Sequence, residues 1–133
     1  MIHILDKVTS TNIWAFDNLI RIYDSVLSFE QSKGRGRDNR SWSSSLGGFY
    51  FSFLSESHPL LPFISGISIV QALPDIDSQL RLKWPNDIIL NGKKLGGILC
   101  EDDGRRAIVG IGLNFDTTPS LPNSTSLSDK NYN

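Results

Sequence analysis

The chain has 133 residues, the size of a single domain, and 39% of them are hydrophobic, as in an ordinary globular protein. Its formal net charge is -1, so a broad basic surface for nucleic acid is not expected. The single cysteine, Cys100, excludes an intrachain disulfide framework. The two histidines, His3 and His58, are far apart and lack acidic or cysteine partners at metal spacing, so no dedicated metal site is expected.

Targeting signals are not evident in the sequence. The first residues lack a basic segment followed by a long apolar stretch, and the apolar region 59–73 is interrupted by Pro62, Gly66 and Gln71. We therefore expect neither a secretory signal peptide nor a membrane-spanning helix. The expected location is the cytoplasm, with no membrane partner.

The hydrophobic pattern predicts seven strands and two helices. Alternating apolar or aromatic runs predict strands at residues 2–5, 25–30, 48–54, 81–84, 88–90, 94–101 and 106–115. Apolar residues at helical spacing predict helices over residues 13–20 and 60–73. Residues 9–12 supply N-cap side chains for the first helix, and Pro74 ends the second.

The connections indicate how these elements are arranged. Asn91-Gly92 between two apolar runs is the preferred two-residue turn of a β-hairpin. From Asp116 onward the chain is polar and contains prolines, which predicts a loop. Hairpins combined with two helices predict an α+β domain over residues 1–133, with a mixed, mainly antiparallel sheet and helices packed on one face.

The most informative segment is 31–43, which carries basic residues and glycines and has no apolar side chain before Trp42. Such a segment cannot build a core. Glycines let the backbone approach a ligand closely, and arginines offer forks of donors to carboxylate or phosphate. The pattern therefore indicates an anion clamp, and a solvated basic loop is the alternative.

Three further segments have residues suited to ligand binding. Lys83–Asp87 places a cation, an aromatic ring, a proline and two polar side chains at a strand end, although a strand ended by a turn has the same pattern. Lys93–Leu99 opens a strand with lysines and a glycine pair, which marks close approach of a ligand or of another backbone, or a surface bulge. Gly110–Asn114 has glycines on one face of a strand, which leaves space beside the sheet.

Taken together and in order, these segments resemble the catalytic domain of biotin protein ligases. The resemblance covers residues 5–127 and rests on Ser10-Thr11-Asn12, Gln31, the GRGRxxRxW segment Gly34–Trp42, KWPND at Lys83–Asp87, KLGGIL at Lys94–Leu99 and GIGLN at Gly110–Asn114. It implies a fold like that of class II aminoacyl-tRNA synthetases. Members of this family usually continue into a C-terminal β-domain, and some begin with a DNA-binding helix-turn-helix. We expect neither here, so the domain is short at its C-terminus and no nucleic-acid partner is expected.

The resemblance also implies a reaction. Biotin and Mg-ATP would give biotinyl-5′-adenylate and pyrophosphate, and a lysine of a biotin carboxyl carrier protein would then take the biotinyl group. The substrates are biotin and ATP, Mg²⁺ is bound with ATP rather than at a dedicated protein site, and a homodimer is left open.

Site residues follow from the matched motifs. Catalytic roles are implied for Lys94 and Arg37. Contacts to biotin are implied for Ser10, Thr11, Gln31, Gly34, Arg35, Arg37, Lys94 and Gly97. Contacts to the nucleotide are implied for Arg40, Trp42, Lys83, Asn86, Asp87, Gly110 and Asn114. Trp42 could equally be a core tryptophan.

Two other functions remain open from the sequence. A biotin- or adenylate-binding module without catalysis would keep the same motifs. A lipoate or octanoyl ligase would have a related fold, but the Arg-Arg-x-Ser-Gly-Gly pattern of those enzymes does not occur in this sequence. Cys100 lies inside a predicted strand and is interpreted as a small core residue rather than a nucleophile.

Overall fold

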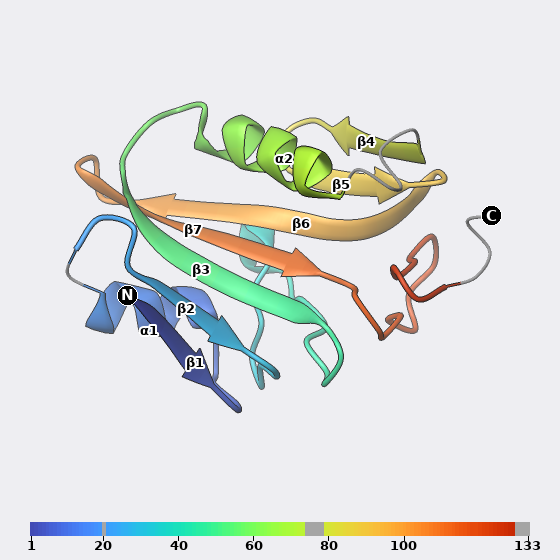
Figure 1. The fold of residues 1–133 in the computed structure, drawn as a ribbon, viewed down its shortest axis with the longest axis horizontal. Helices are drawn as coiled ribbons and strands as arrows, with labels where there is room; N and C mark the ends of the chain where they lie inside the picture. Colours follow the sequence, from blue (N-terminus) through green and yellow to red (C-terminus); the bar gives the residue numbers. More distant parts are fainter. Residues whose placement is uncertain (20, 74–78, 130–133) are drawn as a thin grey trace.

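The computed structural model describes residues 1–19, 21–73 and 79–129. Its centre is a seven-stranded sheet with the order β1-β2-β3-β7-β6-β5-β4 (Figure 1). The strands are β1 (Ile2–Leu5), β2 (Ser25–Ser28), β3 (Phe49–Glu56), β4 (Leu80–Lys83), β5 (Asp87–Leu90), β6 (Lys93–Asp102) and β7 (Arg106–Leu113). The helices are α1 (Thr11–Asn18), α2 (Leu61–Ala72) and the 3-10 turn η1 (Arg37–Asn39).

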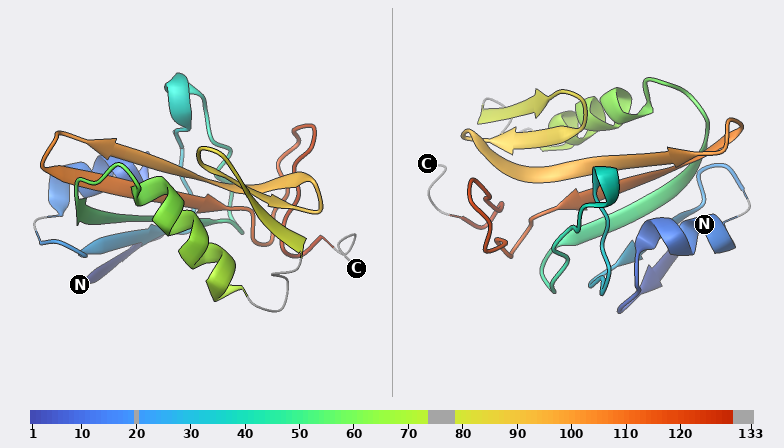
Figure 2. Two further views of the ribbon diagram at one scale, coloured as in Figure 1. Left: turned by 90° about the horizontal axis from the view of Figure 1, so that it is seen from above. Right: turned by 180° about the vertical axis from the view of Figure 1, so that it is seen from behind.

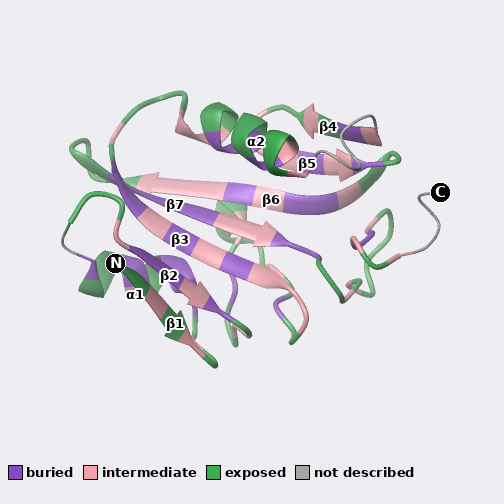
Figure 3. Cartoon of the chain, in the orientation of Figure 1, coloured by how far each residue is buried: buried purple, intermediate pink, exposed green. Residues whose placement is uncertain are grey.

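The predicted α+β class and the mixed, mainly antiparallel sheet are confirmed. The β1–β2 pair is parallel, and β2–β3, β3–β7, β7–β6, β6–β5 and β5–β4 are antiparallel. Figure 3 shows buried residues along the middle of the sheet, in β3, β6 and β7. No helix in the described ranges is long and apolar enough to cross a membrane.

The two helices lie on opposite faces of the sheet, which corrects the expectation of a single covered face. Ala15 of α1 packs with Leu54 of β3, whereas Ile69 of α2 belongs to the cluster that includes Phe53, the neighbouring residue of β3. Successive side chains of a strand point to opposite faces. In the left view of Figure 2, α2 (green) lies on one side of the sheet and the turn η1 (cyan) lies on the other.

The handedness of the connections explains this arrangement. Both β1-α1-β2 and β3-α2-β4 join parallel strands, and such connections are almost always right-handed. Both connections lead to a strand that stands later in the strand order. Their first strands, β1 and β3, run antiparallel to each other. Two right-handed connections of that kind must place their helices on opposite faces.

The local predictions agree closely with the structure. Ser10 is the N-cap of α1, and its side chain accepts a hydrogen bond from Ile13 N at 3.5 Å. Asn91 and Gly92 have φ values of 51° and 75° and join β5 to β6, as the hairpin turn requires. The strands predicted to end at residues 30 and 115 end at 28 and 113. Pro74, the predicted end of the second helix, lies outside the described residues.

Candidate functional site

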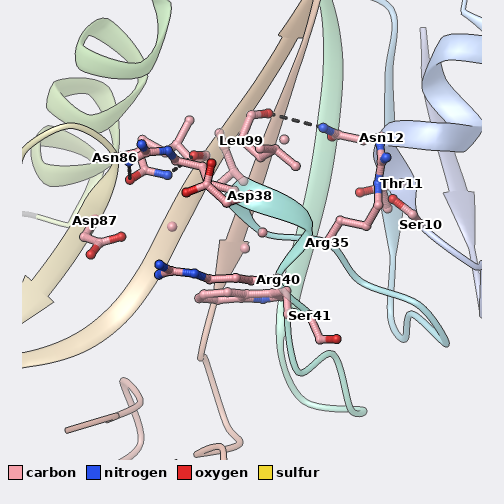
Figure 4. Close-up of a pocket in the computed structure, with 18 of the residues that line it drawn as sticks. Ser10, Thr11, Asn12, Arg35, Asp38, Arg40, Ser41, Asn86, Asp87 and Leu99 are labelled. Carbon is pink, nitrogen blue, oxygen red and sulfur yellow. Dashed lines mark hydrogen bonds between the residues drawn. The ribbon is translucent and has the colours of Figure 1, made fainter.

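A cavity of about 350 Å³ lies on the face of the sheet that carries α1. Its walls come from the start of α1, the segment 31–42, the β4–β5 connection, and β6 and β7 (Figure 4). A cavity of this size is typical of a small-molecule site. Most of the predicted site residues line it, namely Ser10, Thr11, Gln31, Arg35, Arg37, Arg40, Trp42, Asn86, Asp87, Lys94, Gly97 and Gly110.

The floor of the cavity is made of glycines on β6 and β7. Gly97 pairs with Gly112, and Gly110 is the next residue of β7 on the same face. A side chain at Gly112 would place Cβ 2.6 Å from Trp42 Nε1, and one at Gly110 would overlap the Asn12 amide. These glycines therefore leave space that Trp42 and Asn12 fill, and the two side chains define the cavity above the sheet.

Asn12 anchors the start of α1 to the sheet. Its Nδ2 donates to Leu99 O at 3.2 Å and to Glu101 Oε1 at 2.9 Å, and its Oδ1 lies 2.6 Å from Ser52 Oγ. Because Asn12 Oδ1 can only accept, the Ser52 hydroxyl donates to it. Asn12 is 5% exposed, and its bond with Ser52 is buried, whereas those to Leu99 and Glu101 are part-buried.

Gln31 joins the same end of α1 to the basic loop. Its Oε1 accepts from Thr11 N at 2.7 Å and from Thr11 Oγ1 at 3.1 Å, while its Nε2 donates to Ser44 Oγ at 2.8 Å. Both ends of the amide therefore have partners, and the orientation of Gln31 at the cavity edge is fixed.

The basic loop of residues 34–42 folds as a tight hairpin over the cavity. Gly36 N donates to Arg40 O at 2.7 Å, and Trp42 N donates to Gly34 O at 2.8 Å. A Cβ at Gly34 would lie 2.5 Å from Trp42 O, so only glycine fits there. Gly34 is buried at the base of the loop and is not among the residues that line the cavity, so its contact with biotin stays a prediction.

The cavity carries more positive than negative charge. Its lining includes Arg35, Arg37, Arg40 and Lys94, against the carboxylates Asp38 and Asp87. Arg37 Nη1 donates to Asn86 Oδ1 at 3.3 Å. An excess of cations around a cavity favours anionic ligands.

Lys94 is fixed by contacts of its side chain and of its backbone. Its side-chain Nζ lies 3.1 Å from Asp87 Oδ1 and 5.1 Å from the centre of the Trp42 ring. Lys94 N donates to Asn123 O at 2.7 Å, and Thr125 N donates to Lys94 O at 3.0 Å. The polar segment after Asp116 is therefore a loop, as predicted, but it also fixes this lysine.

Two predicted nucleotide contacts lie outside the cavity lining. Asn114 is buried, and its Nδ2 donates to Thr125 O at 3.0 Å, so it holds the loop that fixes Lys94. Lys83 is exposed at the end of β4 and lines a smaller hollow next to Pro62 and Phe63 of α2. Their roles toward a nucleotide stay predictions.

Sequence reasoning missed several contributors to the site, and Asn12, Ser52 and Glu101 are the ones that hold the start of α1. Asn12 stood in the Ser10-Thr11-Asn12 motif but was not assigned a role. Ser52 and Glu101 lie in strands without any local signal, and only the pairing of β3, β7 and β6 brings them to α1.

Cys100 is not among the residues that line the cavity. Burial raises the pKa of its thiol to about 12, with the nearby charge of Asp102 adding to the effect. The thiol is therefore protonated at neutral pH, which agrees with a packing role rather than a nucleophilic one.

This raised pKa predicts a loss of stability in alkaline solution. Above pH 9, the ordinary pKa of the thiol, the unfolded chain releases a proton that the folded chain keeps until about pH 12. The free energy of unfolding should therefore fall as the pH rises through this range. Urea denaturation at a series of pH values would measure it, and Cys100→Ala should show a shallower fall. Identical pH dependence in the two proteins would contradict the prediction.

Comparison with known proteins agrees with this geometry. The model of the Biotin/lipoate A/B protein ligase family matches residues 3–116. The bifunctional ligase/repressor BirA of Bacillus subtilis is 36% identical over 108 residues, which are 71% of this chain and 33% of that protein.

Two solved structures have a similar fold. A biotin protein ligase from Leishmania major, in complex with biotinyl-5-AMP, is 32% identical with a TM-score of 0.84, and the match covers 95% of this chain and 62% of that one. A biotin protein ligase from Aquifex aeolicus, in complex with biotin and ATP, is 34% identical with a TM-score of 0.85, over 95% and 59% of the two chains. The chain thus spans about a third of the Bacillus relative and less than two thirds of these ligases. Since the family match covers most of its residues, this chain belongs to the biotin/lipoate A/B protein ligase family.

Proposed function

We propose that this protein activates biotin with ATP to form biotinyl-5′-adenylate and transfers the biotinyl group to a lysine of a biotin carboxyl carrier protein. The observation that carries the proposal is the single cavity in which the Ser-Thr-Asn, GRGR, KWPND and KLGG segments meet. The complexes of the Leishmania and Aquifex relatives with biotinyl-5-AMP and with biotin and ATP support it.

The reaction joins two anions, which explains the cations of the cavity. A carboxylate oxygen of biotin attacks the α-phosphorus of ATP, and pyrophosphate leaves. The carboxylate is already ionised at neutral pH, so no general base is required. The protein must instead hold two repelling groups in line and stabilise the charge that develops between them. Lys94, on β6, and Arg37, on the basic loop, both line the cavity and would do both.

The polar groups suggest how the substrates lie. Ser10, Thr11 and Gln31 form the end of the cavity near α1, where they can bind the ring of biotin. The other end, with Asn86 and Asp87, would receive the nucleotide. Lys94 pairs with Asp87, so the biotin carboxylate would meet the α-phosphate beside this lysine.

Mg²⁺ would enter together with ATP. No group of three or more His, Cys, Asp or Glu side chains that could hold a metal occurs in the part of the chain that the structure describes. Mg²⁺ is often held by one or two carboxylates together with substrate phosphates and water. Asp87, in the cavity lining, is a carboxylate that fits this role.

A non-catalytic biotin-binding module is the second candidate, because the chain spans less than two thirds of the ligases that it resembles. The proposal is tested by measuring pyrophosphate release from ATP with biotin, lipoate or octanoate, followed by transfer to a carrier protein. We expect pyrophosphate release with biotin but not with lipoate or octanoate. Pyrophosphate release with lipoate or octanoate, but not with biotin, would identify that acid as the substrate instead. No pyrophosphate release with any of the three acids would favour the binding module.

Arg37→Gly is expected to let the adenylate escape. Arg37 ties the loop to Asn86, and a loop held in this way would exclude water from the cavity. Without this contact, activated biotin should leave and label lysines of bystander proteins. Mass spectrometry of a mixture with serum albumin would count the labelled lysines. Equal labelling by the parent protein and by an Arg37→Gly protein that still forms adenylate would exclude this role.

A further inference from the structure

We propose that Glu101 is a positioning residue that latches the basic loop onto the sheet through Arg35. The consequence for biotin rests on the proposed function, but the latch itself does not. Arg35 Nη2 donates to Glu101 Oε1, and the two residues form an ion pair between the loop and the far end of β6.

Glu101 is held in place by a hydrogen bond from Asn12. The oxygen that accepts from Arg35 also accepts from Asn12 Nδ2 at 2.9 Å. Asn12 is in turn held by Leu99 O and Ser52 Oγ. The carboxylate therefore presents a fixed acceptor to the loop, and its position depends on the hydrogen bonds of Asn12 at the start of α1.

Arg35 differs from the other cations near the loop because it has a carboxylate partner. No carboxylate of the described residues lies within 4.0 Å of a side-chain nitrogen of Lys33, Arg37 or Arg40. These cations repel one another and favour opening of the loop. The pair with Glu101 neutralises one cation of the set and ties it to the sheet.

The pair lies between two cavities: Arg35 lines the main cavity, and Glu101 lines only its neighbour. A second cavity of about 310 Å³ lies beside the first and is lined in part by Phe16, Asp17 and Glu101. Asn12 and Arg35 line both cavities. In Figure 4 Arg35 turns toward Asn12, whereas Arg40 extends toward Asp87. Arg35 therefore closes the α1 end of the site, and Arg37 and Arg40 remain available for substrate charge.

The test measures loop opening in the absence of any ligand. The amides of Gly36, Arg40 and Trp42 are hydrogen-bonded within the loop, so their hydrogen exchange reports its opening. Loss of an exposed ion pair in Glu101→Gln should raise the exchange rates of these amides by about two- to fivefold. Glutamine keeps an oxygen that accepts from Asn12, so the start of α1 should stay in place. Asp17→Asn, which removes one negative charge from the second cavity, should exchange like the parent protein.

A double-mutant cycle separates a latch from a general loss of structure. Arg35→Gln should raise exchange as Glu101→Gln does, and the double variant should show no further rise, because either change removes the same ion pair. Equal exchange in Glu101→Gln and the parent would overturn the proposal. A rise that extends to the amides of β3 and β7, or additive effects of the two changes, would also overturn it.

Biotin provides a second readout. Loop residues line the cavity, so a latch that guards bound biotin predicts a dissociation rate that rises by the same factor as the exchange in Glu101→Gln, with a smaller change in the rate of adenylate formation. If loop exchange responds as expected but biotin does not bind to the parent protein, the proposed function fails and the latch stands. An unchanged dissociation rate in a protein that binds biotin would mean that the latch does not guard the site.

Discussion

Lys94→Ala is expected to slow the formation of biotinyl-5′-adenylate by about 10² to 10³, the usual cost of losing one charge-stabilising donor in a preorganised site. The ammonium group of Lys94 lies beside Asp87 and the Trp42 ring, at the cavity. Its charge matters most as negative charge develops during attack on the α-phosphorus. The fold should persist, since the bonds from Lys94 to Asn123 and Thr125 involve only its backbone.

Lys93→Ala is the matched control. Lys93 is the preceding residue of β6, is exposed and does not line the cavity. Both variants lose one positive charge, so a general electrostatic effect would slow both equally. Adenylate formation by Lys94→Ala at the parent rate, or equal slowing in the two variants, would show that this lysine has no specific role.

Gly110→Ala is expected to destabilise the protein by about 1–3 kcal/mol, the usual cost of overpacking a well-filled region. The added Cβ would overlap the Asn12 side chain. Asn12 is buried and bonded to Leu99 and Glu101, so it cannot move away without leaving polar atoms unpaired. The loop latch depends on the same side chain and should loosen together with the fold.

Gly97→Ala provides the control for this change. Gly97 lies on the same face of the sheet, but the nearest atom to its added Cβ would be Trp42 Cζ3 at an ordinary 3.5 Å. Urea denaturation should show a change in the free energy of unfolding within about 0.5 kcal/mol, as for substitutions without a clash. Equal losses in the two variants would mean that glycine is needed for strand geometry and not for the space that Asn12 fills.

Features set by short stretches of sequence could be predicted well. The turn at Asn91-Gly92, the N-cap at Ser10 and the end of regular structure near Asp116 each depend on residues that are neighbours in the chain. The motifs also identified most of the cavity lining, because each motif stands at the end of a strand or helix that the fold brings to one place.

Features that depend on long-range pairing could not be predicted in this way. The pattern of a helix indicates which of its sides is buried, but the face of the sheet that it covers depends on strand order, as for α1 and α2. Glu101 could not be assigned either, because it contacts Arg35 only after β6 pairs with β7. The bond from Asn114 Nδ2 to Thr125 O could not be predicted either, because the loop that carries Thr125 has no regular pattern, and the contact of Asn114 with a nucleotide stays a prediction.

The most direct test of the account is the detection of biotinyl-5′-adenylate itself. The protein is mixed with biotin and Mg-ATP, the reaction is stopped with acid, and the small molecules are identified by mass spectrometry. We expect biotinyl-5′-adenylate in an amount equal to that of the protein, formed only when both substrates are present and reduced in Lys94→Ala. Binding of biotin without adenylate or pyrophosphate, at saturating ATP, would contradict the account and leave a binding module.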